Sequence, residues 1–103
     1  MTAGLVEAVT SVVPPDAAPV EVLGEGAAAA QLREALGRPG DGRPAVVVDT
    51  TGDPARIADA LERLDDLGTL VLAGPTPSGP VPLDLYSDLH VRGLTVVGVP
   101  PGT

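Results

Sequence analysis

The residues best suited to chemistry are glycines and small side chains that follow short apolar runs. Gly24, Gly26 and Ala29 match the pattern G-x-G-x-x-G/A, between the β-rich stretch Pro19–Leu23 and the helix-forming stretch Ala27–Leu36. In this pattern the first glycine permits a tight turn, the second lets a diphosphate approach the backbone, and the small third residue allows close helix–strand packing. Unpaired N–H groups at the helix start would favour the anion. A purely structural strand-to-helix turn is the alternative.

A second candidate set follows two other apolar runs. The segment Asp49–Gly52 begins at the last residue of the Val-rich run Pro44–Asp49, and Gly74 follows the run Thr69–Ala73. Ligands of parallel sheets collect at the carboxyl ends of the strands. The residues expected to face a cofactor there are Thr50, Thr51, Gly52 and Gly74. The alternative is that these glycines only mark tight connections.

Several kinds of chemistry are excluded by composition. The six basic residues are all Arg, and the chain has no Cys, which excludes a Schiff-base lysine, a P-loop lysine, a thiol nucleophile and a cysteine-ligated zinc site. Ser87, Asp88 and His90 are close in sequence, but no nucleophile elbow accompanies them. No acidic cluster has calcium-loop spacing. We therefore predict no catalytic residue and no metal site.

Length and charge limit the partners. A chain of 103 residues is one domain at most, and its fourteen acidic residues give a net charge of −8 with His90 neutral. Such an acidic surface repels nucleic acids and anionic membranes. No apolar run approaches membrane-spanning length, and no leader-like segment begins the sequence. We expect a cytoplasmic location.

The order of apolar runs predicts an α/β fold with a small, mainly parallel sheet of about four strands and flanking helices. A helix, with a strand as the competing interpretation, is expected over Ala3–Val13. The predicted strands are Pro19–Leu23, Pro44–Asp49, Thr69–Ala73 and Leu94–Val99; the predicted helices are Ala27–Leu36, a segment between Asp53 and Gly68, and a short turn or helix over Leu83–Val91.

The segment after Asp53 is the best-specified helix. Asp53 can cap it and Pro54 suits its first turn. Ile57, Leu61 and Leu64 line one apolar face of this helix. Asp59 and Arg63 form an i,i+4 ion pair in the favourable order. The 13 glycines and 12 prolines fall between the apolar runs. We expect disorder where they concentrate, at Gly37–Arg43, Pro75–Pro82 and Pro100–Thr103.

The stretch Val46–Gly98 resembles the last half of the cofactor-binding domain of medium-chain dehydrogenases/reductases. The matching features are Thr51-Gly52, Ala60-Leu61, Gly74, His90–Leu94 and Gly98. Upstream, Leu5–Ala8 is similar to the helix that precedes that domain, and Val20–Ala29 to its first strand and glycine turn. The resemblance implies one reduced Rossmann-like domain over residues 1–103, with 1–15 as an N-terminal helix or arm and 100–103 as a tail. It also implies NAD(P) as a possible cofactor.

This sequence lacks parts of the family pattern that hydride transfer requires. Only eight residues separate Leu36 from Ala45, where a full domain has two further strands and a helix. No residue can take the place of the acid that holds the adenosine ribose, and the zinc-bearing catalytic domain has no counterpart. His90 matches a structural turn. The resemblance implies ancestry and fold, and leaves hydride transfer open.

The short connection also raises a question of handedness. Since parallel crossovers are right-handed in about 98% of cases, a direct step from the first strand to the second would put both helices on one face and remove the nucleotide crevice. An atypical crossover, pairing of the first strand in another chain, and loss of the cofactor site are the three possible outcomes. We favour the last.

Three functions remain open. The leading hypothesis is a non-catalytic binding or interaction module, a homodimer joined through the edge strand Leu94–Val99. The second is an NAD(P)-binding subunit or fragment of an oxidoreductase whose catalytic domain is on another chain. The third is a small-molecule pocket at the strand ends Gly24, Gly52 and Gly74.

Overall fold

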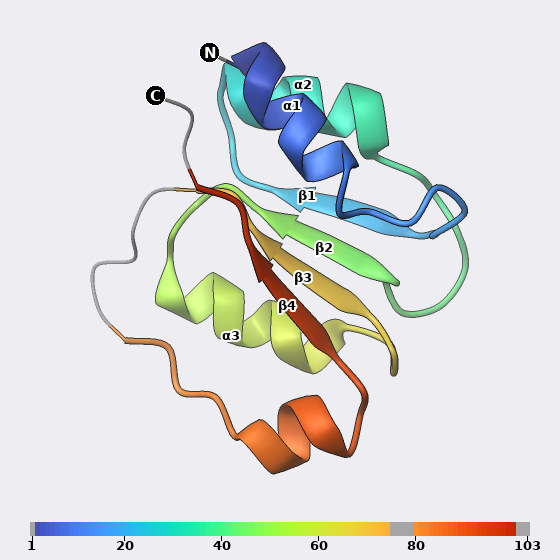
Figure 1. Ribbon diagram of the computed structural model, residues 1–103, viewed down its shortest axis with the longest axis vertical. Helices are drawn as coiled ribbons and strands as arrows, with labels where there is room; N and C mark the ends of the chain where they lie inside the picture. The colour runs from blue at the N-terminus through green and yellow to red at the C-terminus, as the bar shows by residue number, and fades with distance from the viewer. Residues whose placement is uncertain (1, 75–79, 101–103) are drawn as a thin grey trace.

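The computed structural model describes residues 2–74 and 80–100 and contains a four-stranded, wholly parallel sheet (Figure 1). Its order is β1-β2-β3-β4, formed by Val20–Leu23, Val46–Asp49, Thr69–Leu72 and Thr95–Gly98. The predicted α/β class and parallel sheet are confirmed. Strand register aligns Leu23, Asp49, Leu72 and Gly98, so all four strands end at one rim of the sheet.

In the described part of the chain, three α-helices and one π-helical turn connect and cover the strands. They are α1 (Thr2–Thr10), α2 (Ala27–Leu36), α3 (Pro54–Arg63) and η1 (Leu85–His90). The first segment is a helix and not a strand, as the leading interpretation had it. Helix α1 ends before Pro14-Pro15. Within residues 2–74 and 80–100, no helix is both long and apolar enough to cross a membrane.

Helix α3 begins as predicted and ends early. Asp53 accepts a hydrogen bond from the Ala55 N–H (2.9 Å), and the predicted apolar face is buried. The helix ends at Arg63, well before the predicted stop at Gly68. The chain turns instead through Leu67, which has a left-handed φ of 67° and donates its N–H to the Arg92 carbonyl (2.9 Å).

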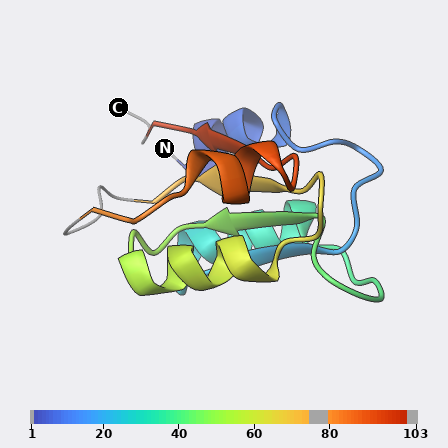
Figure 2. The ribbon, with the colours of Figure 1, turned by 90° about the horizontal axis from the view of Figure 1, so that it is seen from below.

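The two faces of the sheet carry separate cores. On one face, α1 and α2 pack with alternate strand residues in a cluster that includes Val9, Leu32 and Val48. On the other, α3 packs in a cluster that includes Leu61, Val47 and Leu70, and Leu89 of η1 lies against it. Figure 2 shows α3 and η1 in front of the strands and α1 and α2 behind them. The expectation that the two crossover helices, α2 and α3, share one face is therefore wrong.

This arrangement fixes the relative hand of the crossovers. The chain moves in one direction across the sheet, but α2 crosses on one face and α3 and η1 on the other. The β1–α2–β2 crossover thus has the opposite hand to the two that follow, and the atypical crossover is the outcome found. This crossover has the unusual hand because α2 buries its apolar side together with α1 on one face, while α3 occupies the opposite face.

The connection between α2 and β2 runs beside the outer edge of β1. Arg38 forms an antiparallel bridge with Val20, and its guanidinium donates to the carbonyls of Pro14 (3.1 Å) and Ala17 (3.0 Å). At the other end of the segment, Arg43 donates to the Arg63 carbonyl at 3.2 Å. The expectation of disorder over Gly37–Arg43 is therefore wrong, because these bonds hold both ends of the segment. Of the other two segments expected to be disordered, residues 75–79 and 101–103 lie outside the described residues.

Candidate functional site

The predicted site residues meet at the rim, which here means Gly24–Gly26, Thr50–Gly52 and Gly74. A Cβ on Gly24 would lie 2.0 Å from Thr50 Oγ1, and one on Gly74 would lie 2.5 Å from the Thr50 carbonyl carbon. Both glycines thus allow their loops to pack against Thr50. The structure brings together the loops after β1, β2 and β3, as the sequence predicts.

The glycine turn leads directly into α2. Gly24 and Gly26 have φ values of 123° and 97°, which L side chains rarely adopt. Gly26 is the N-cap residue of α2, and no side chain of the described residues accepts a hydrogen bond from the first turn. A Cβ on Gly26 would meet no atom within 4 Å, so space is open at the helix start. Ala29 is fully buried and lets α2 pack closely in the core, as predicted.

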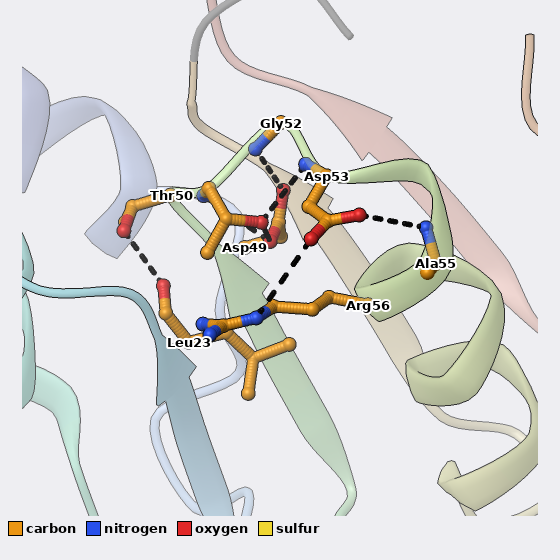
Figure 3. A network of polar contacts seen from close by, with 8 residues as sticks. Leu23, Asp49, Thr50, Gly52, Asp53, Ala55 and Arg56 are labelled. Atoms are coloured by element: carbon orange, nitrogen blue, oxygen red, sulfur yellow. Dashed lines mark hydrogen bonds and ion pairs between the residues drawn. The ribbon is translucent and has the colours of Figure 1, made fainter. Parts of the chain in front are cut away.

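The loop after β2 is held by a buried carboxylate (Figure 3). Asp49, with 1% of its surface exposed, accepts hydrogen bonds from the Thr51 hydroxyl (2.6 Å), the Thr51 N–H (3.2 Å) and the Gly52 N–H (3.0 Å). A buried carboxylate must be compensated by donors of this kind. Asp49 therefore positions the loop, a role that the sequence analysis did not assign to it.

Both threonine hydroxyls of the rim have partners within the chain. Thr50 Oγ1 donates to the Leu23 carbonyl at 2.6 Å, and this bond ties the second loop to the end of β1. Thr51 Oγ1 donates to Asp49 and accepts from the Asp53 N–H at 3.0 Å. The two side chains therefore organise the rim, and direct contact with a cofactor stays a prediction.

Charges near the glycine turn are mixed. The side chain of Arg33 reaches from α2 to the carbonyls of Val22 (2.8 Å) and Gly24 (3.1 Å), while Glu25 is exposed beside the turn. Asp53 and Arg56 form a loose, exposed ion pair at 4.0 Å. Among residues 2–74 and 80–100, no three acidic or histidine side chains gather as metal ligands would. An anion at the turn would depend mainly on backbone N–H groups.

The role of Arg33 could not be predicted from the sequence, because its partners are backbone carbonyls, which leave no charge pattern in the sequence. Asp49 had a visible signal, since it is a carboxylate that directly follows three valines predicted to be buried. A charged group at such a position requires local donors, and the following Thr-Thr-Gly supplies them.

Solved structures with a similar fold are dehydrogenases. The chain matches 2R,3R-butanediol dehydrogenase from Bacillus subtilis with a TM-score of 0.73 and 16% identity, over 95% of this chain and 40% of that one. For L-idonate 5-dehydrogenase from Escherichia coli the TM-score is 0.66 and the identity 13%, over 94% and 39% of the two chains.

An alcohol dehydrogenase zinc-binding domain protein from Burkholderia ambifaria matches with a TM-score of 0.68 and 15% identity, over 95% of this chain and 38% of that one. No family model and no curated protein matches the sequence. This chain therefore spans about 40% of the length of the solved dehydrogenases it resembles. Its fold is similar to the Rossmann-like region of zinc-type, medium-chain alcohol dehydrogenases.

Proposed function

We propose that this chain is a non-catalytic binding module that holds the diphosphate of a dinucleotide such as NAD(P) at the rim. The observation that carries the proposal is the change of face between α2 and α3. Helices that leave neighbouring parallel strands toward opposite faces open a crevice between their loops, and nucleotides bind in such crevices. Loss of the site was expected because both crossover helices would share one face, and α2 and α3 lie on opposite faces.

The geometry at Gly26 supports the same proposal. The open space there adjoins the first turn of α2, whose N–H groups receive no side-chain cap. Such groups, together with the helix dipole, favour an anion. The sequence offers no acidic residue in the place that holds the adenosine ribose in the family. We therefore expect NAD and NADP to bind with similar affinity. Any hydride transfer would need catalytic groups from outside residues 1–103.

Calorimetric titration with NAD⁺ tests the proposal. Gly26→Trp fills the open space and should weaken binding at least tenfold relative to Gly26→Ala, which imposes the same backbone strain without the bulk. Ala30→Trp, at an exposed position further along α2, should bind as the unchanged protein does. Absence of heat at millimolar NAD⁺, or equal binding by the two Gly26 variants, would contradict the proposal.

A homodimer through β4 is the second proposal, favoured by a difference between the two edges of the sheet. The outer edge of β1 is covered by Arg33 and by the bridge to Arg38, whereas no described strand pairs with the outer edge of β4. Unpaired edges favour pairing with another chain. The N–H groups of Thr95 and Val99 donate toward β3, so by alternation that of Gly98 faces the outer edge of β4. Light scattering on the native chain and on Gly98→Pro, which removes this outward N–H, should report a dimer and a monomer respectively. A native monomer well above micromolar concentration would contradict the dimer.

The cytoplasmic location stays a prediction.

A further inference from the structure

A cavity of about 160 Å³ lies between α3 and the β3–β4 half of the sheet. Its inner wall is formed by Ile57, Leu61, Leu70 and Val96, and its mouth by Val81 and Leu83. None of the rim residues lines it. The cavity is therefore separate from the proposed nucleotide site and lies on the face of the sheet that α3 covers.

Every described side chain that lines the cavity is aliphatic. A buried water needs two to four polar partners, and a dry apolar cavity of about 150 Å³ is known to admit benzene. A charged or strongly polar ligand would lose its hydration without compensation. The lining thus favours an uncharged apolar molecule. The cavity is open to solvent at its mouth, and its volume suits a molecule of about the size of benzene.

The residues of the inner wall are buried, whereas the segment at the mouth is more exposed and has no regular structure. Ile57, Leu61 and Leu70 are 3%, 6% and 1% exposed, whereas Leu83 is 37% exposed. The mouth segment 80–83 belongs to no helix or strand and makes no hydrogen bond to another described residue. Displacing this segment would break no regular structure, so a ligand has a route into the cavity.

We propose that this cavity binds one small apolar molecule, an aromatic or branched aliphatic hydrocarbon of about the size of benzene. Binding buries ligand and wall against each other and should therefore stabilise the folded chain. The proposal needs neither a cofactor nor a second copy of the chain.

The test is a benzene titration of the full chain with labelled Ile, Leu and Val methyl groups, followed by NMR. Saturable shifts are expected at Ile57, Leu61 and Val96, with little change at Val9 and Val22 in the core on the other face. Absence of saturable shifts, or equal shifts on both faces, would overturn the proposal.

Two variants locate the binding. Val96→Phe fills the cavity and should weaken benzene binding at least tenfold, while the matched Val97→Phe, on the opposite face of β4, should not. Circular dichroism checks that each variant folds. Leu83→Glu places a charge at the exposed mouth and should also weaken binding tenfold in a chain whose wall is unchanged. Native-like benzene binding by both Val96→Phe and Leu83→Glu would refute the assignment of the site.

Discussion

Arg38 and Val20 exchange two main-chain hydrogen bonds, 3.0 Å and 3.2 Å long, along the outer edge of β1. The next outward carbonyl, that of Val22, accepts from Arg33. The connection and one side chain thus occupy the position of a neighbouring strand. This explains how a sheet that ends at β1 can leave that edge without a row of free carbonyl groups, which would favour aggregation.

Replacing Arg33 with Met should expose this edge. The methionine keeps most of the apolar stem but donates no hydrogen bond, so we expect a loss of about 1 kcal/mol in the free energy of unfolding and greater self-association. Urea denaturation and light scattering measure the two effects. Gln31→Met, at an exposed position of the same helix, is the control and should change neither. Equal behaviour of the two variants would show that the Arg33 bonds contribute nothing.

Gly24→Ala should destabilise the chain more than Gly26→Ala. Both positions have positive φ, which costs an alanine about 1–3 kcal/mol. Only the Cβ at Gly24 collides with a neighbour, Thr50 Oγ1 at 2.0 Å. The difference should exceed about 1 kcal/mol in chemical denaturation, and it should shrink in a Thr50→Ala background, where the colliding atom is missing. A difference that persists in that background would contradict the steric explanation.

The sequence predicted the elements well because each depends on local signals. The triple valine of β2, the Asp53 cap and the stripe Ile57, Leu61 and Leu64 are readable within a few residues. The rim was also predictable, since parallel strands bring their carboxyl ends together.

The face chosen by α2 was not predictable in the same way. A rule that holds for most parallel crossovers gave the wrong side, because joint burial of α1 and α2 decides it and that contact is distant in sequence. The ordered path of Gly37–Arg43 was missed for a related reason. It depends on the bridge to Val20, and composition alone does not show such pairing.

Arg92 should stabilise the end of α3 although it belongs to the turn before β4. Its guanidinium donates to the Leu61 carbonyl at 2.7 Å and to the Leu64 carbonyl, and only 20% of its side chain is exposed. Arg92→Met should lower the free energy of unfolding by about 1–2 kcal/mol, because carbonyls at a helix end lose their donors. Arg56→Met removes an exposed, loose ion pair and should cost under about 0.5 kcal/mol. Equal losses in denaturation would contradict this ranking.

The start of η1 should depend on pH through Asp84. Its carboxylate accepts from the N–H groups of Ser87 (2.9 Å) and Tyr86 (3.0 Å), and these bonds lower the pKa of Asp84 below the ordinary value of 3.8. A lowered folded-state pKa means that the stabilisation is present above pH 3.8 and is lost as the pH falls through the lowered pKa. Amide shifts of Tyr86 and Ser87 should therefore change with a midpoint below 3.8. Asp84→Asn retains an acceptor but does not titrate, so this transition should vanish, whereas Asp16→Asn should leave it unchanged. A midpoint at or above the ordinary value would mean that the capping bonds do not favour the ionised form.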